Sequence, residues 1–236
     1  MSGNRVDGLG EGDAVLSART GSAGRTGTLD IYADLQRRLM TAGFSPGAKL
    51  MPSALQHEYG CSANTVRDVL LQLSKVGLVE FEIQRGFRAR RVSAARHADV
   101  ARFRILLEQE GAVASMRRGD LPWEVRLTAA HHSLRHIERQ IARSPSSAPF
   151  IVLWSDAELA FHETLISECG MPLLQETYAS VYMQFRQQLV GLTPHFAPEY
   201  FHPIIAEHQA ILDTALAGDE AGLRKAILDH QTRHLG

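Results

Sequence analysis

The sequence has very little cysteine and no long hydrophobic run. Cys61 and Cys169 are the only cysteines among 236 residues, too few for a disulfide framework or a cysteine zinc site. No apolar stretch approaches the ~20 residues that cross a membrane. The first residues, MSGNRVDGLGEGDA, lack the apolar core of a secretory signal. We therefore expect a soluble protein of the cytoplasm that engages no membrane.

An excess of charge of one sign is also missing, because 25 Lys and Arg face 26 Asp and Glu. The distribution is uneven, however. Residues 28–92 hold nine basic and six acidic residues, whereas residues 93–236 hold thirteen and seventeen, together with ten of the eleven histidines. A mildly basic small module joined to an acidic, histidine-rich larger one indicates two separate functions. The hydrophobic fraction of 44% excludes a disordered chain.

Residues 1–27 contain seven glycines and no aromatic residue, which predicts a flexible tail. From residue 28 onward, apolar residues recur at helical spacing up to Ala42-Gly43 and predict a first helix. Ser53 begins a capping-box pattern for a second, short helix, and Ser62 is placed to cap a third that ends at Gly77. Two strand-like runs, 79–83 and 87–92, are joined by Gln84-Arg85-Gly86 and predict a β-hairpin. Three helices and a hairpin form a winged helix-turn-helix plan.

The rest of the chain predicts helices almost throughout, separated by short Gly- and Pro-containing links. Six helices of this length favour an antiparallel all-α helical bundle. The expected spans are 97–118, 123–142, 150–169, 172–191, 202–217 and 219–234. The fold class is therefore mainly α, with an N-terminal winged helix-turn-helix and a C-terminal helical bundle.

The order of motifs resembles that of GntR-family transcription regulators. Pro46-Gly47-Ala48-Lys49-Leu50, then Gly60-Cys61-Ser62, then Val66-Arg67-Asp68-Val69-Leu70 follow the family's DNA-binding pattern. Glu158-Leu-Ala-Phe161-His162 and Glu207-His208 are similar to motifs of the helical ligand domain, called FCD, of the FadR subfamily. The resemblance implies a winged helix-turn-helix domain over 28–92 and an effector-binding and dimerisation domain over 97–236.

The function implied by the resemblance is transcription regulation, interpreted as repression. The partners would be double-stranded operator DNA, a second copy in a homodimer, and a small carboxylate effector that changes operator affinity. A rival hypothesis is a metal-dependent enzyme, which the winged module and the absence of a nucleophile motif disfavour. A further alternative is that a metal bound in the helical bundle is purely structural and that the bundle serves only for dimerisation.

Residues at the start of the third predicted helix are the candidates for DNA contact. Asn64 can pair with adenine, Thr65 can touch bases or phosphate, and Arg67 can grip phosphate or guanine. The family often has Arg at the position of Ala63, so we expect a different operator here. The alternative to DNA contact is that these residues form a solvent-exposed helix start with an ordinary N-cap and have no binding role. The DNA-binding candidates are Ser53, Ser62, Asn64, Thr65, Arg67, Arg85 and Gly86.

Glu158, His162, His208 and His230 are the candidate metal ligands. Glu158 and His162 share one helix face, and each of the other two lies on the apolar face of its helix. The resemblance places all four at the family's metal positions, although Glu158 stands where metal-binding members usually carry Asp. One divalent ion would fit, with zinc favoured by the imidazoles and nickel or manganese as alternatives. We expect metal and effector affinity to fall together below about pH 6.

Arg104 and Arg186 are the candidate effector-binding residues, because each lies in a mostly apolar helical stretch where an arginine needs a partner. That partner would be either a structural one, Glu108 or Glu176, or the carboxylate of the effector. The remaining histidines are interpreted as surface or loop residues; these are His131, His132, His136, His195, His202 and His234.

Overall fold

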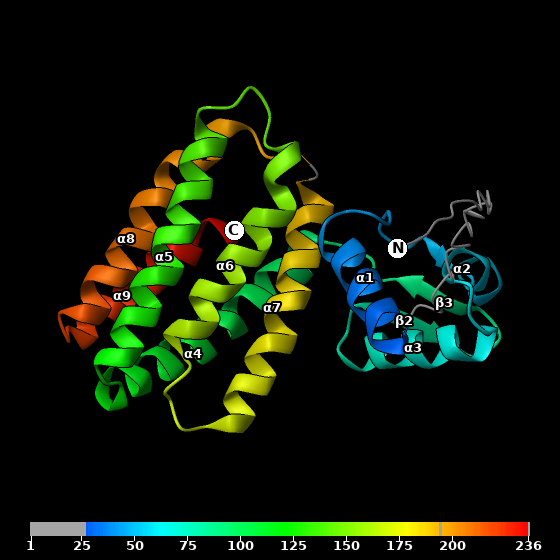
Figure 1. Ribbon diagram of the computed structural model, residues 1–236, viewed down its shortest axis with the longest axis horizontal. Coiled ribbons are helices and arrows are strands. Elements are labelled where there is room, and N and C mark those ends of the chain that lie inside the picture. Colours follow the sequence, from blue (N-terminus) through cyan, green and yellow to red (C-terminus); the bar gives the residue numbers. More distant parts are fainter. Residues whose placement is uncertain (1–26, 194, 236) are drawn as a thin grey trace, which may run out of the picture.

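The computed structural model describes residues 27–193 and 195–235. These residues form a small head and a larger helical bundle, each with its own hydrophobic core (Figure 1). The mainly helical fold predicted from the sequence is confirmed. The predicted tail lies, apart from Gly27, outside the described residues.

The head contains three helices and an antiparallel sheet with strand order β1-β3-β2. Its core forms where the apolar face of α3 packs against α1, α2 and β2, and Ile31, Val66 and Leu70 are fully buried there. Strand β1 was not predicted, because two residues carry no periodic signal. The bounds are α1 (Thr28–Met40), β1 (Lys49–Leu50), α2 (Pro52–Tyr59), α3 (Ala63–Lys75), β2 (Val79–Glu82) and β3 (Gly86–Ala89).

Two of the predicted helix caps have different outcomes. Ser62 caps α3 as expected, with its Oγ accepting a hydrogen bond from the Thr65 N–H at 3.1 Å. The capping box at Ser53 is wrong, because α2 begins at Pro52 and Ser53 is already inside the helix. Proline suits a first helical position, since its φ is preset and its missing N–H would have no helical partner.

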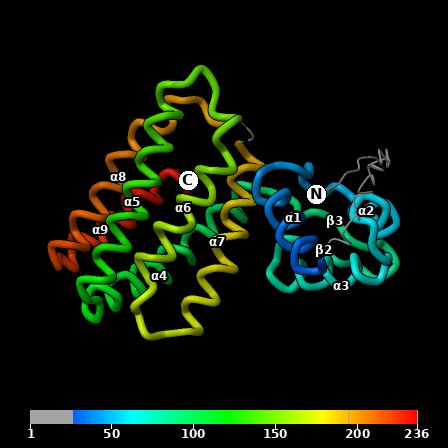
Figure 2. Tube along the Cα trace, viewed as in Figure 1, coloured from blue at the N-terminus to red at the C-terminus, as the bar shows by residue number. Residues whose placement is uncertain are grey.

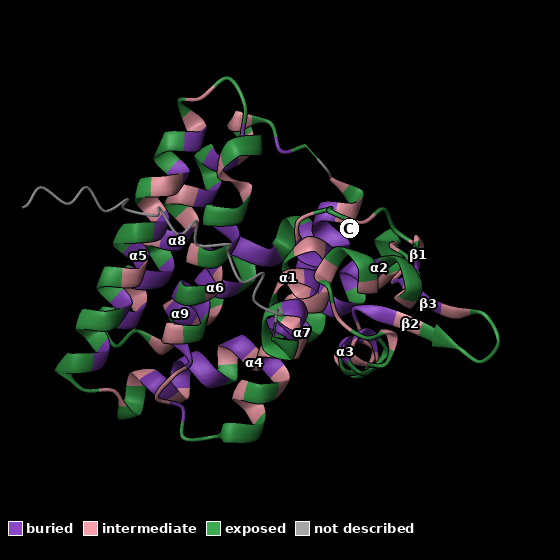
Figure 3. Cartoon of the chain, turned by 45° about the vertical axis from the view of Figure 1, so that its right-hand side comes forward, coloured by how far each residue is buried: buried purple, intermediate pink, exposed green. Residues whose placement is uncertain are grey.

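The bundle consists of six helices. Helix α4 packs along α7 and α9, while α5 packs along α6 and α8. Buried residues lie mainly on the sides that face other helices, and the outer sides are exposed (Figure 3). None of the described helices is long and apolar enough to cross a membrane. The bounds are α4 (Ala94–Arg118), α5 (Leu121–Ala142), η1 (Ala148–Phe150), α6 (Ile151–Leu165), α7 (Pro172–Leu192), η2 (Pro198–Tyr200), α8 (Phe201–Leu216), α9 (Glu220–Gln231) and η3 (Thr232–His234).

Helix α7 carries the contacts between bundle and head, and α1 runs beside it (Figure 2). The Gln187 side-chain amide donates to the Leu78 carbonyl at 2.9 Å, and that of Gln188 donates to the Arg91 carbonyl at 3.0 Å. The Gln188 Oε1 also accepts from the N–H of Ser93, the residue that caps α4, at 3.1 Å. One helix therefore holds both the head and the link between the two parts.

Candidate functional site: a three-histidine centre beside an arginine pair

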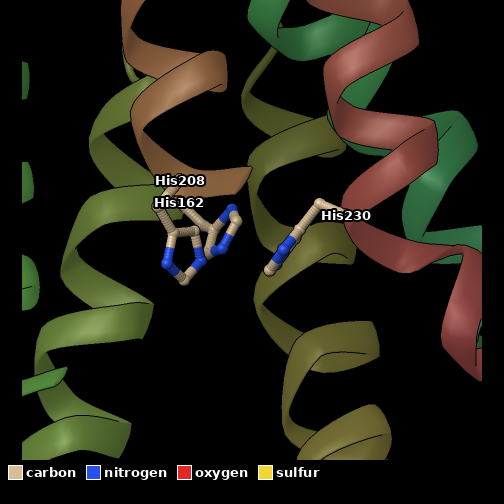
Figure 4. Close-up of side chains that lie close together, drawn as sticks. All are labelled: His162, His208 and His230. Carbon is tan, nitrogen blue, oxygen red and sulfur yellow. The ribbon is translucent and has the colours of Figure 1, made fainter. Parts of the chain in front are cut away.

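Three buried histidines from three helices point their rings toward one space in the bundle (Figure 4). His162 comes from α6, His208 from α8 and His230 from α9. One ligand atom from each lies within 4.8 Å of those of the other two. The ring centroids of His208 and His230 are 4.4 Å apart. The three predicted histidines are thus brought together by the tertiary structure.

Each imidazole is oriented by a glutamate from another helix. A carboxylate that accepts from Nδ1–H fixes the ring and leaves the Nε2 lone pair free for a metal, an arrangement common in metal sites. The pairs are His162 Nδ1 with Glu108 at 2.6 Å, His208 Nδ1 with Glu138 at 2.9 Å, and His230 Nδ1 with Glu207 at 3.0 Å.

The pKa shifts of two of the three rings favour metal binding. Burial lowers the pKa of His162 and of His230, so both rings are neutral at pH 7. Burial would also lower the pKa of His208, but the Glu138 carboxylate outweighs it and raises the pKa. The Nε2 atoms of His162 and His208 are buried and have no hydrogen-bond partner among the described residues. Such orphaned atoms are costly in a core, and a divalent cation would satisfy both.

Glu158, the predicted fourth ligand, is not part of the three-histidine group. Its Oε2 accepts a hydrogen bond from Arg186 Nη1 at 2.9 Å, and its Oε1 lies 3.6 Å from Arg104 Nη1. Burial raises the pKa of Glu158, but Arg186 and Arg104 outweigh burial and lower it. The carboxylate is therefore ionised and held by the two arginines.

Arg104 and Arg186 are both fully buried, and both have structural partners. Arg104 donates to Glu108 at 3.3 Å, which is one of the two expected partners, and its guanidinium lies over the Phe185 ring. Arg186 lies over the indole of Trp154, with 4.0 Å between the guanidinium carbon and the ring centroid. Glu176 is not a partner of either arginine among the described contacts.

The space between these groups is nearly closed. A cavity of about 10 Å³ lies beside Arg104 and Glu158 and is also lined by Trp154, His230 and Gln231. A water molecule needs at least about 10–15 Å³ of such volume. The site is therefore closed around its own side chains.

Two of the three orienting glutamates, Glu138 and Glu207, were not singled out from the sequence. A signal for Glu138 exists, because it continues the buried stripe Leu127, His131, Leu134, Ile141 of α5. A glutamate in such a stripe needs a buried partner. Glu207 directly precedes His208 but serves His230 of the next helix, a pairing without a local signal.

Two of the histidines interpreted as surface residues are buried, which corrects that expectation. His131 lies in the α5 stripe beside the Phe161 ring, and burial lowers its pKa to about 4. His234 in η3 packs against His97 of α4, with 3.0 Å between Nδ1 and Nε2. Burial, His97 and Arg104 lower the pKa of His234 to about 3. The exposed positions of His132, His136, His195 and His202 agree with the expectation.

The DNA-binding candidates occupy the start of α3 and the neighbouring surface of the head. Asn64 and Arg67 are exposed, and their side chains have no partner among the described residues. The hydroxyl of Thr65 lies 2.9 Å from that of Ser62, the α3 cap. Ser53 is exposed on the first turn of α2. This arrangement leaves Asn64 and Arg67 free for an external partner.

The wing is the hairpin of β2 and β3. Arg85 lies in its turn, is highly exposed and pairs with Glu82 at 2.9 Å. Gly86 has φ +80°, a conformation that glycine adopts without strain. Two neighbouring arginines make hydrogen bonds within the head instead. Arg88 donates to the Gly47 carbonyl, and Arg90 donates to the Gly77 carbonyl.

Comparison with known proteins bears on both parts of the chain. Residues 28–88 match the domain described as bacterial regulatory proteins, gntR family, and residues 99–233 match the FCD domain. The HTH-type transcriptional regulator BphR of Paraburkholderia xenovorans is 31% identical over 188 residues, which are 80% of this chain and 75% of that protein. The chain belongs to the GntR family.

A second relative and two solved structures are also similar to the chain. An HTH-type regulator of Streptomyces ambofaciens is 29% identical over 208 residues, covering 88% of this chain and 83% of that protein. The structure of E. coli McbR/YncC has a TM-score of 0.74 at 20% identity and covers 87% of this chain and 93% of its own. A GntR regulator of Rhodococcus sp. RHA1 has a TM-score of 0.69 at 21% identity, with 89% and 97% covered. The two structures show the shared fold.

Membership of the GntR family decides between the function classes. The protein is a DNA-binding transcription regulator with an FCD domain, and GntR-family regulators bind operator DNA. The matching families and relatives are regulators rather than enzymes, so the hypothesis of a metal-dependent enzyme is rejected.

Proposed function

We propose that this GntR-family protein is a repressor whose operator affinity is controlled by a small carboxylate bound beside a divalent metal in the bundle. The observation that carries the proposal is the three-imidazole cluster in the bundle core together with two buried guanidiniums, those of Arg104 and Arg186, that share the Glu158 carboxylate. Imidazoles hold a metal, and guanidiniums hold a carboxylate in a bidentate fashion.

His162, His208 and His230 would hold the metal through Nε2, while Glu108, Glu138 and Glu207 keep the rings in place. When bound, a divalent ion supplies positive charge and a coordination position for a carboxylate oxygen. The donor set of three imidazoles suits zinc and nickel, and manganese becomes more favourable if a carboxylate joins the set.

Helix α7 provides a physical connection between this site and the head. Arg186 and Phe185 face the effector region, while Gln187 and Gln188 hold the head and the linker. The contact is tight at Gly77, because an added Cβ would lie 2.7 Å from the Gln184 side chain. A shift of α7 would therefore be transmitted to the head through these hydrogen bonds and this contact.

The DNA-binding unit would be a homodimer. One head presents too few base-reading residues for useful specificity, whereas two heads related by a two-fold axis read a palindromic operator with half-sites about one helical turn apart. Asn64, Thr65 and Arg67 would enter the major groove, with Ser62 capping the helix. Ser53 and the wing residues Arg85 and Gly86 would contact the backbone.

The test combines operator selection with ligand titration. DNA fragments selected by the purified protein from a random pool are used in fluorescence anisotropy, with and without zinc, while small carboxylic acids are added. We expect at least one acid to change operator affinity five- to 150-fold, the range of a 1–3 kcal/mol coupling. If chelation leaves ligand affinity unchanged but lowers the melting temperature, the metal is purely structural. If no carboxylate changes operator affinity, the proposed control is wrong.

A further inference from the structure

The Arg104–Arg186 pair is occupied by a carboxylate of the chain itself, but incompletely. Glu158 accepts one hydrogen bond from Arg186, while its contact with Arg104 at 3.6 Å is an ion pair without a hydrogen bond. Nη1 and Nη2 of Arg104 and Nε and Nη2 of Arg186 are buried without a partner among the described residues. A guanidinium fork binds a carboxylate best through two parallel hydrogen bonds. The pair therefore has four unused donors.

An added carboxylate cannot reach these donors in the present arrangement. The cavity beside Arg104 and Glu158 measures about 10 Å³, which is at the lower limit for a single water molecule and too small for a carboxylate. Some side chain must leave before a ligand enters. Glu158 is the group whose departure both opens space and releases the two arginines.

The balance of buried charge limits the ligand further. Among the described residues, the buried arginines and glutamates are Arg104, Arg186, Glu108, Glu138 and Glu158. Three carboxylates and two guanidiniums leave one net negative charge, and a divalent cation would convert this to one net positive charge. Unbalanced buried charge is unfavourable. A ligand with a single negative charge neutralises the metal-loaded site, whereas a dianion would leave it negative.

We propose that Glu158 is a built-in carboxylate that occupies the Arg104–Arg186 pair, and that a small monocarboxylate effector binds by displacing it. The inference rests on the proposed function, since it names how an effector enters that site and which charge it carries. The displaced Glu158 shares a helix face with His162, so it becomes available for the role of fourth metal ligand that its i,i+4 spacing predicts.

Acetate is the probe, because it carries the same functional group as the Glu158 side chain. Glu158→Ala removes the internal carboxylate, leaves space for acetate, and leaves Arg186 without a carboxylate partner and Arg104 with Glu108 alone. We expect this variant to melt at a lower temperature than the wild type and to regain stability with acetate in a saturable manner. Acetamide, which has the same shape without the charge, should give no rescue. The melting readout remains informative even if the variant is strongly destabilised.

Affinity measurements on folded protein test the competition itself. Glu158→Gln retains the shape of the side chain but replaces the charged carboxylate with a neutral amide, which competes less well for the two arginines. Acetate should therefore bind this variant at least tenfold more tightly than it binds the wild type. Glu163→Gln is the matched control, because Glu163 is exposed on the same helix and should leave acetate affinity unchanged. Zinc loading should strengthen acetate binding in the wild type and in Glu158→Gln. Malonate, a dianion, should bind less tightly than acetate.

The outcomes separate this inference from the proposed function. If acetate binds the wild type and Glu158→Gln equally, and Arg186→Gln abolishes binding, the carboxylate site stands but the displacement of Glu158 is wrong. If acetate neither rescues Glu158→Ala nor binds any variant more tightly than acetamide, both proposals are overturned. Rescue of Glu158→Ala together with tighter binding to Glu158→Gln supports the displacement.

Discussion

At the scale of single residues, the orientation of the three clustered histidine rings depends on the glutamates that accept hydrogen bonds from them. Glu138 is fully buried, and its Oε1 accepts from both His208 Nδ1 and the Trp154 indole N–H. The indole contact holds the carboxylate, and the carboxylate holds the ring. The rings are thus held in place without a metal, which would lower the entropic cost of binding one.

Substitution of His208 tests the centre most directly. His208→Ala should lose the bound metal, since only two imidazoles remain, and Glu138→Gln should weaken metal affinity about 10- to 100-fold. His202→Ala on the same helix is the matched control, because His202 is exposed and is not one of the three clustered histidines. The measurement is metal content after dialysis. Equal metal content in His208→Ala and the control would remove His208 from the site.

His208 should also determine how metal affinity changes at acidic pH. Its raised pKa means that it takes up a proton at a higher pH than a free imidazole, whose pKa is about 6.5, while the lowered pKa values of His162 and His230 keep those rings neutral. Because metal requires an unprotonated Nε2, metal affinity should begin to fall at a higher pH than it would for a free imidazole, by up to about tenfold per pH unit. This is a higher onset than the value near 6 expected from the sequence.

Metal affinity measured from pH 8 to pH 5 with a competing chelator checks the onset. Glu138→Gln removes the carboxylate that raises the pKa of His208, so its onset should move to lower pH. A flat profile down to pH 5.5 in the wild type would contradict the role of His208.

At the scale of elements, two helices matter for the proposed function: α3, at the surface of the head, and α7, between the head and the bundle. Helix α3 is capped by Ser62, buries one stripe against the head and presents its first turns to solvent. Helix α7 is buried along most of its length and contacts both cores. We expect α3 to read DNA and α7 to transmit changes in the bundle to the head.

Substitutions on α3 should separate affinity from specificity. Arg67→Ala should weaken binding to all DNA sequences, whereas Asn64→Ala should lose about 1–3 kcal/mol of discrimination at one base pair. Lys75→Ala, at the exposed far end of the same helix, is the control. Binding is measured by anisotropy on the operator and its single-base variants. Wild-type binding by both Arg67→Ala and Asn64→Ala would remove this helix start from the interface.

Substitutions on α7 should disconnect the two parts. Gln187→Ala combined with Gln188→Ala removes three hydrogen bonds to the head and linker while leaving the histidines and arginines in place. We expect unchanged ligand affinity of the bundle but a much smaller effect of ligand on operator affinity. Gln140→Ala on the exposed surface of α5 is the control. A full ligand effect in the double variant would show that coupling runs through other contacts.

At the scale of the whole molecule, charge and symmetry govern how the protein meets DNA. The net charge of −1 is near zero, but residues 28–92 carry a small positive excess. Attraction to DNA is therefore local to the head. Two heads in one molecule would double that attraction and align it with a two-fold symmetric operator.

The assembled molecule should be a dimer in solution and on DNA. Light scattering should give about twice the 26.0 kDa of one chain, and footprinting should protect two related half-sites. Affinity should fall with salt at a log–log slope of about −0.9 per phosphate neutralised. A monomeric mass, a single unrepeated half-site or a salt-independent interaction would each contradict this expectation.

Features that depend on neighbouring residues were determined by the sequence alone. Helical periodicity, the Ser62 cap, the hairpin and the inward faces of His162, His208 and His230 follow from spacing along one helix or strand, and the order of motifs identified the family. Tertiary packing decided which groups meet across helices. It placed Glu158 on Arg186 instead of among the histidines, matched Glu138 to His208 and Glu207 to His230, and buried His131 and His234. The physical reason is that periodicity shows which face of a helix points inward, whereas buried charges select partners by distance, and those distances exist only after the helices have packed.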